Sequence, residues 1–275
     1  MRIEANRIRL FAIDVDGTLL DGSHRLTTEV KDAVCRLAAS GLEIALATAR
    51  GPQAVREIVQ QFNFAPWLIC FSGGWIGELE LPSLQPKNVR LDLRIPNRAA
   101  RSVLAEALNQ GVEPNVFTPE TWRVRSLTEE IAEETRIVNL RPEISGELLP
   151  DSTEPSKIML ISRLEFAGQV LPRIEKSINS VCAVTFSKPN YLEVLPFGVN
   201  KAGALAKLSQ TLDISLKQAA AIGDGLNDLE MLNSVGLPIA MGNAVDLLKS
   251  KAKWVVRTND EGGVAEAGER LVHHQ

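Results

Sequence analysis

The first eighty residues alternate between short apolar runs and amphipathic stretches. The runs 10–13, 42–47 and 67–71 are nearly free of charge, which is typical of strands buried on both faces of a sheet. Between them, apolar residues recur at helical spacing over 28–40, and Gly51-Pro52 opens a second helical stretch, since proline suits a first helical position. The order strand, helix, strand, helix, strand predicts a parallel sheet covered by helices.

The pattern changes near Pro82. Residues 89–95 alternate between apolar and polar side chains, which predicts a strand with one face in water. We expect helices over 97–110 and 165–179, and a charged helix or loop over 129–136. Further strands are expected over 112–117, 122–125, 157–162, 181–186 and 191–195. Helices mixed with one-faced strands indicate a separate α+β domain at 82–195, inserted into the first domain.

From Pro196 the first pattern returns. A helix is expected over 201–212, followed by a short buried strand over 219–222. The later expected elements are a helix around Met231, a strand over 237–241, a helix over 244–251, a strand over 254–256 and a final helix. The fold class predicted from the pattern is therefore α/β: a Rossmann-like parallel-sheet core formed by 1–81 and 196–275, with the α+β domain inserted.

Composition excludes several classes of protein. The net charge of −4 is shared evenly, with 14 Lys and Arg against 15 Asp and Glu in 82–195, so we expect no nucleic-acid partner. No apolar run approaches the roughly 20 residues of a membrane span, and residues 1–9 lack the apolar centre of a signal peptide. Three cysteines, an odd and sparse set in apolar surroundings, favour reduced thiols and a cytoplasmic location. The oligomeric state stays open.

Two carboxylates follow the first apolar run, in Asp14-Val15-Asp16-Gly17-Thr18. Because a strand alternates its faces, Asp14 and Asp16 can both face one point beyond the strand end. Carboxylates buried together are costly unless a cation lies beside them. The motif therefore suggests a site for a hard cation and an anionic ligand, although a solvated acidic turn is the alternative for this motif taken alone.

Other polar residues also follow expected strands. In a parallel α/β sheet the carboxyl ends of the strands lie at one edge, where ligands bind. The residues at these positions are Asp14, Asp16, Thr48, Ser72, Asp224 and Asp228. Together with Lys201 and with glycines at 17, 223 and 225, whose backbone N–H groups can approach phosphate oxygens, they indicate a magnesium–phosphate site.

These residues carry a resemblance to a known family. Asp14-x-Asp16-Gly17-Thr18, Thr48, Lys201 and Gly223-Asp224-Gly225-x-Asn227-Asp228 resemble, in order and setting, the four motifs of the haloacid dehalogenase superfamily. The insertion resembles its type C2 cap. The stretches 198–201 and 259–264 are similar to the Cof-type (IIB) sugar-phosphate phosphatases. The resemblance covers essentially the whole chain, and it implies this family's fold and cofactor, Mg²⁺.

The resemblance also implies a role for each residue. Asp14 is expected to be the nucleophile that forms an aspartyl-phosphate, and Asp16 the general acid and then the base. Thr48 and Lys201 are expected to hold phosphate oxygens. The metal would be held by Asp14, the Asp16 backbone carbonyl and Asp224. Asp228 would be either a further ligand or a residue that contacts the ligands without touching the metal. Asn227 would orient phosphate or water. The inserted cap would select the substrate.

Several of these residues have plainer interpretations when taken singly. Lys201 could be a surface lysine, Thr48 a hydroxyl that satisfies the next helix, and Asp228 an acid favoured by a helix dipole. For Arg50 there are two interpretations, a contact with the substrate and an ion pair with a surface acid, and the sequence does not favour one over the other. Glu193 is expected to be structural. The motif Ser72-Gly73-Gly74 departs from the Asn-Gly-Ala usual in this subfamily, which puts substrate details in doubt.

The function expected from the sequence is a Mg²⁺-dependent phosphatase acting on a small phosphorylated metabolite, a sugar phosphate above all. A phosphotransferase such as a phosphohexomutase is the alternative among enzymes, since the same aspartyl-phosphate can pass to a sugar hydroxyl. A non-catalytic regulator that binds a phosphorylated ligand is the alternative from another class, but such a protein does not need the acid Asp16.

Overall fold

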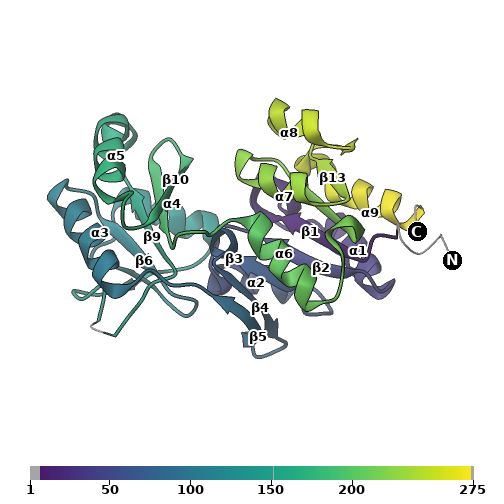
Figure 1. The fold of residues 1–275 in the computed structure, drawn as a ribbon, viewed down its shortest axis with the longest axis horizontal. Coiled ribbons are helices and arrows are strands. Elements are labelled where there is room, and N and C mark those ends of the chain that lie inside the picture. The colour runs from purple at the N-terminus through teal and green to yellow at the C-terminus, as the bar shows by residue number, and fades with distance from the viewer. Residues whose placement is uncertain (1–6, 151, 274–275) are drawn as a thin grey trace. The chain divides into compact units, whose positions relative to one another are not determined.

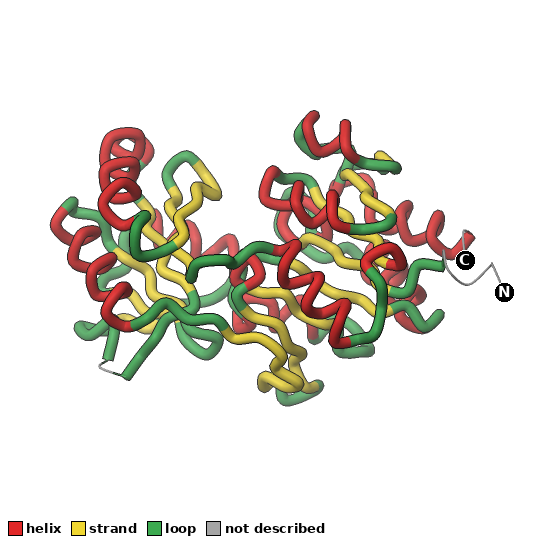
Figure 2. Tube along the Cα trace, in the orientation of Figure 1, coloured by secondary structure: helices red, strands yellow, loops and turns green. Residues whose placement is uncertain are grey.

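The structure is a computed structural model and describes residues 7–150 and 152–273; the remaining residues are grey in Figure 2. Most of the polar start of the chain thus lies outside the described residues. The described chain forms two compact units. Unit 1 comprises 7–49, 56–91 and 200–273, and unit 2 comprises 50–55 and 92–199. The expected boundaries of the inserted domain were 82 and 195. The longer segment of unit 2 begins at Asp92, because the preceding strand pair belongs to the sheet of unit 1.

Unit 1 is built on an eight-stranded sheet with the order β14-β13-β12-β1-β2-β3-β4-β5. Its strands are β1 (Leu10–Asp14), β2 (Glu43–Ala47), β3 (Trp67–Cys70), β4 (Trp75–Glu80), β5 (Gln85–Asp92), β12 (Ala219–Gly223), β13 (Leu237–Ala240) and β14 (Trp254–Val255). The strands from β14 to β3 pair in parallel. The predicted α/β fold with a parallel-sheet core is therefore confirmed.

Strand β4 was not expected from the sequence. It pairs antiparallel with β3, because Phe71 and Ser72, with φ of 50° and 57°, and Gly73, with φ of 109°, reverse the chain between the two strands. A side chain at Gly73 would overlap the backbone carbonyl of Asn200. The Ser72-Gly73-Gly74 motif thus forms a tight reversal against the segment that leads into Lys201.

Helices cover the sheet of unit 1 (Figure 1). They are α1 (Thr28–Ala39), α2 (Arg56–Val59), α6 (Lys201–Thr211), α7 (Leu229–Ser234), α8 (Asp246–Lys251) and α9 (Gly263–His273). Helix α1 packs on α9, and α6 packs on α7. The side chain of Asn200 accepts a hydrogen bond from the Gly203 N–H at 2.6 Å, so it caps α6 and fixes Lys201 as the first helical residue.

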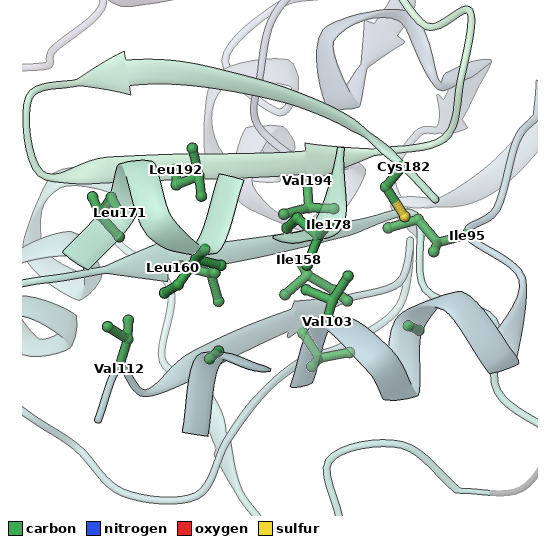
Figure 3. Packing of buried hydrophobic residues seen from close by; sticks show 14 of the residues in the cluster. Ile95, Val103, Val112, Ile158, Leu160, Leu171, Ile178, Cys182, Leu192 and Val194 are labelled. Atoms are coloured by element: carbon green, nitrogen blue, oxygen red, sulfur yellow. The ribbon is translucent and has the colours of Figure 1, made fainter. Parts of the chain in front are cut away.

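Unit 2 contains a six-stranded sheet with the order β10-β11-β9-β6-β7-β8. The elements are α3 (Asn97–Asn109), β6 (Pro114–Phe117), β7 (Trp122–Val124), α4 (Glu129–Val138), β8 (Glu143–Ile144), β9 (Lys157–Ile161), α5 (Leu164–Ile178), β10 (Ala183–Lys188) and β11 (Tyr191–Leu195). Apolar side chains of α3 and α5, among them Val103 and Leu171, meet Ile158, Leu160 and Leu192 of the sheet in one buried cluster (Figure 3). This unit therefore has a hydrophobic core of its own.

The expectation of one wet face is wrong for β9 and β11, since every residue of both strands is buried. Lys157 and Glu193 lie on the face opposite the cluster, because side chains alternate along a strand. The Lys157 Nζ atom is 3.6 Å from Glu193 Oε2 and lies over the ring of Phe117. A buried charge is costly unless an opposite charge lies beside it, as Lys157 and Glu193 do for each other. This ion pair is the structural contact expected for Glu193.

Within the described residues, no helix is both long and apolar enough to cross a bilayer. Cys35, Cys70 and Cys182 form no disulfide with one another, and the last two are buried.

Candidate active site

The candidate active site is built around the end of β1. Asp14 is the last residue of this strand, and its side chain is buried. The following turn, Val15–Leu19, contains Gly17 with φ of 79°, a conformation that favours glycine. A Cβ atom at Gly17 would also overlap the carboxylate of Asp224. The turn can therefore approach Asp224 closely only because residue 17 is glycine.

Lys201 is brought to the same point by the first turn of α6. Its Nζ atom lies 2.5 Å from Asp14 Oδ1 and 2.7 Å from Asp228 Oδ1, and the side chain is buried. A lone surface lysine is therefore excluded. Burial opposes the charged form of Lys201, but the carboxylates of Asp14 and Asp228 outweigh burial and raise its pKa. Lys201 is held as a cation between two acids.

The acids carry more negative charge than Lys201 compensates. Burial, with repulsion from Asp228, raises the pKa of Asp14 well above its ordinary value despite the contact with Lys201. Burial and the same repulsion raise the pKa of Asp224 to about 6. Both shifts show that the charged forms of Asp14 and Asp224 are penalised. A second cation at this point would relieve that penalty.

Asp228 is fully buried, and both of its oxygens already accept hydrogen bonds. Oδ1 accepts from Lys201, while Oδ2 accepts from the backbone N–H groups of Asp224 at 3.2 Å and Gly225 at 3.1 Å. These bonds hold the loop after β12 in place. Of the two positions expected for Asp228, the contacts favour the one behind the metal ligands.

Asp224 is oriented by the turn after β1. Thr18 Oγ1 donates to Asp224 Oδ1 at 3.3 Å. One oxygen each of Asp14, Asp224 and Asp228 lies within 4.8 Å of the others. Carboxylate oxygens are ligands suited to Mg²⁺. The raised pKa values of Asp14 and Asp224 indicate that a positive charge beside these carboxylates would be favourable. The donor set thus fits a hard divalent cation.

Asp16, Thr48 and Asn227 differ in how far their side chains are exposed. Asp16 follows Asp14 by two residues, but its side chain is 42% exposed and lies near His24, whose Nδ1 is 3.6 Å from Asp16 Oδ1. Thr48 is buried at the end of β2, where its N–H donates to the Ile69 carbonyl at 2.8 Å. Asn227 is exposed in the short 3-10 turn Leu226–Asp228.

Arg50 is buried and belongs to unit 2, together with the segment 50–55. Its Nη2 atom donates to the backbone carbonyl of Ile137, in α4, at 3.5 Å. The last carbonyl groups of a helix lack partners within the helix, and cations there are favourable. This contact to a helix end was neither of the two interpretations considered from the sequence. A contact of Arg50 with substrate stays a prediction.

Sequence reasoning did not assign a role to four residues around this turn: Thr18, Asn243, Asn259 and Asp260. Asn243 follows the apolar strand β13, so the rule applied to the other strand ends would have found it. Asn259 and Asp260 lie in a quoted motif, but their partners are more than 200 residues away in the chain. Only the folded chain shows what they contact.

A family model described as haloacid dehalogenase-like hydrolase matches residues 11–267. The chain belongs to the haloacid dehalogenase-like hydrolases. The family expected from the four motifs, Cof-type, is thereby confirmed, and so is the expectation that the protein is an enzyme of this hydrolase class. Nearly all of the described chain takes part in the match.

Individual relatives agree with this assignment. A 5-amino-6-(5-phospho-D-ribitylamino)uracil phosphatase of Bacillus subtilis, YcsE, is 28% identical, with 94% of each chain covered. An HMP-PP phosphatase of Citrobacter koseri is 30% identical over 87% of this chain and 86% of the relative. A haloacid dehalogenase-like hydrolase of Bacteroides thetaiotaomicron has a similar fold, with a TM-score of 0.88, 24% identity, and coverage of 96% of this chain and 100% of that one.

Proposed function

We propose that this family member is a Mg²⁺-dependent phosphatase that hydrolyses a small phosphorylated metabolite, a sugar phosphate in particular, through an aspartyl-phosphate. The observation that carries the proposal is the Asp14 carboxylate, buried at the end of β1 with Lys201 at 2.5 Å and Asp224 close by. A buried carboxylate beside a fixed cation can approach a phosphoryl group, because the cation offsets the repulsion between two anions.

The chemistry assigns one task to each group. An oxygen of Asp14 attacks phosphorus, and the bond to the leaving oxygen breaks with its electron pair staying on that oxygen. Asp16 gives the leaving oxygen a proton and later takes one from the water that cleaves the aspartyl-phosphate. Its exposed side chain can reach solvent, as this exchange requires. Lys201 and Thr48 bind phosphoryl oxygens, Gly17 offers its N–H group, and Asn227 orients phosphate or water.

The metal would be held by Asp14, Asp224 and the backbone carbonyl of Asp16, with Asp228 behind them. When bound, Mg²⁺ offsets charge on the phosphoryl oxygens. Asp228 acts on Lys201 and on the backbone of Asp224, and both contacts pre-organise the site before substrate arrives. Asp14 is the nucleophile of the first step, and water is the nucleophile of the second.

The substrate class is supported by the relatives. The Bacillus subtilis relative is named as a phosphatase of 5-amino-6-(5-phospho-D-ribitylamino)uracil, a phosphorylated ribityl compound. We propose a similar polyol or sugar ester here. The proposed chemical groups lie in unit 1, apart from Arg50, whereas unit 2 has its own core and the buried Lys157–Glu193 pair. We therefore assign choice of the leaving group to unit 2.

The test measures phosphate release from p-nitrophenyl phosphate and from a panel of sugar and polyol phosphates, with Mg²⁺ and with a chelator. We expect Mg²⁺-dependent release that Asp14→Asn abolishes. Transfer of the phosphoryl group to a second sugar, with little free phosphate, would instead identify a phosphotransferase. Binding of the panel without turnover would identify a regulator. Cell fractionation tests the cytoplasmic location, which stays a prediction.

The role of unit 2 has a separate test. Glu193→Gln removes the charged partner of the buried Lys157 and so should disturb the packing of unit 2. The ranking of kcat/KM across the panel should then change while p-nitrophenyl phosphate is cleaved as before, because only the larger leaving groups need remote contacts. An unchanged ranking in a protein of normal stability would place selection of the leaving group elsewhere.

A further inference from the structure

The turn that follows Asp14 and carries Asp16 is held by side chains from the last third of the chain. We propose that Asn243 and Asn259 are positioning residues that hold this turn and Asp224 in the arrangement that binds Mg²⁺. The inference rests on the proposed function, because the metal site belongs to it. Neither residue is expected to touch the reacting atoms.

Asn243 lies in the loop after β13 and contacts both the turn after β1 and the Asp224 carboxylate. Its Nδ2 atom donates to the Gly17 carbonyl at 2.8 Å and lies 3.5 Å from Asp224 Oδ2. Its Oδ1 atom accepts from the Asn259 N–H at 3.0 Å. Three of the four hydrogen-bonding directions of this amide are thus used. A single side chain joins the turn after β1 to the carboxylate after β12.

Asn259 holds the far end of the same turn. It begins the 3-10 turn Asn259–Glu261, and its Nδ2 atom donates to the Leu20 carbonyl at 2.9 Å. The next residue, Asp260, accepts from the Gly22 N–H at 2.7 Å. The carbonyl groups of Gly17 and Leu20 are therefore bound by two asparagines, Asn243 and Asn259, that are hydrogen-bonded to each other.

The turn needs such ties because its backbone is irregular. Asp16 has φ of −81° and ψ of 121°, and Gly17 has a positive φ, so neighbouring peptide groups are not held in a continuous helical ladder. The Asp16 carbonyl, the proposed ligand, lies one peptide before the Gly17 carbonyl. Fixing the Gly17 carbonyl therefore limits how far the Asp16 carbonyl can rotate.

Asp224 is held in the same way. Thr18 contacts its Oδ1 atom and Asn243 contacts its Oδ2 atom. Hydrogen bonds to the ligand side chains orient them and raise metal affinity, and their loss typically weakens binding about 10- to 100-fold. Asn243 acts on two ligands at once, whereas Asn259 acts on the turn alone.

The experiment compares Mg²⁺ affinity by titration calorimetry in the full chain, without substrate. We expect Asn243→Ala to weaken Mg²⁺ binding about 10-fold and Asn259→Ala to weaken it by less. The matched control is Gln61→Glu, which removes another exposed amide-to-carbonyl bond of unit 1, from Gln61 to the carbonyl of Glu57. This control should bind Mg²⁺ like the wild type.

Wild-type Mg²⁺ affinity in Asn243→Ala would overturn the proposal, and so would an equal loss in Gln61→Glu. Melting curves without Mg²⁺ show whether each variant is folded; if Asn243→Ala is not, Asn259→Ala decides by the same comparison. A wild-type protein that binds Mg²⁺ but hydrolyses no phosphate ester would defeat the proposed function alone. The calorimetric comparison would still decide the role of the two asparagines.

Discussion

Lys201 Nζ lies 2.5 Å from Asp14 Oδ1, so the first residue of α6 neutralises the carboxylate at the end of β1. The same ammonium group is 2.7 Å from Asp228 Oδ1. This contact brings together residues 187 positions apart in the chain. It makes one lysine responsible both for the stability of the buried acids and, as proposed, for binding phosphate.

Replacing Lys201 by Met should therefore affect stability and activity together. Removal of one partner of a buried ionic group costs about 3–5 kcal/mol of unfolding free energy, and here two acids lose their shared cation. Urea unfolding measures the loss, and inhibition by inorganic phosphate measures ligand binding. Lys207→Met, at an outward position of the same helix, is the control. Equal stability and phosphate inhibition in the Lys201 variant and the control would contradict the role given to Lys201.

Asp14→Asn should abolish turnover while the protein stays folded. An amide does not attack phosphorus, yet it has the shape of the carboxylate and removes a buried charge whose pKa is already raised. We expect kcat to fall by about 10⁴-fold or more. Single-turnover assays and a circular dichroism spectrum provide the two readouts. Appreciable activity in a cleanly purified variant would remove Asp14 from the role of nucleophile.

Asp224→Asn and Asp228→Asn should differ in their effects on the metal. Each oxygen of Asp224 accepts one side-chain hydrogen bond, from Thr18 or from Asn243, and keeps a second lone pair for a cation, so its variant should lose Mg²⁺ binding. Asp228 accepts three hydrogen bonds, so its variant should lose stability while it keeps measurable Mg²⁺ affinity. Calorimetry and thermal unfolding on both variants make the comparison. Reversed results would make Asp228 the direct ligand.

Mg²⁺ binding should weaken as the pH falls through about 6, because the pKa of Asp224 is raised to about 6 in the metal-free protein and metal ligands must be deprotonated. Since the folded protein then binds this proton more tightly than the unfolded chain, the free energy of unfolding without metal should rise as the pH falls from 7 toward 4. The difference between wild type and Asp224→Asn isolates this contribution. A difference that runs in the opposite direction would contradict the assignment.

Local pattern was sufficient for most of the elements. The apolar run ending at Ile13 predicted β1, and the run ending at Ile222 predicted β12, because a strand buried on both faces has few polar residues. Because the carboxyl ends of parallel strands lie at one edge of the sheet, Asp14, Thr48 and Asp224 were then expected together at that edge. Strand β4 was missed because its direction depends on the positive φ angles of Phe71 and Ser72, and non-glycine residues seldom adopt such angles.

The sequence by itself determined which residue types end the strands, and with them the family and the kind of chemistry. Tertiary structure decided which of those residues touch: that Lys201 lies between Asp14 and Asp228, that Asn243 reaches Gly17 across 226 positions, and that Glu193 is buried beside Lys157. The physical reason is that periodicity reports only the face a residue occupies on its own element. Partners from distant elements, and the burial that shifts a pKa, exist only after the elements have packed.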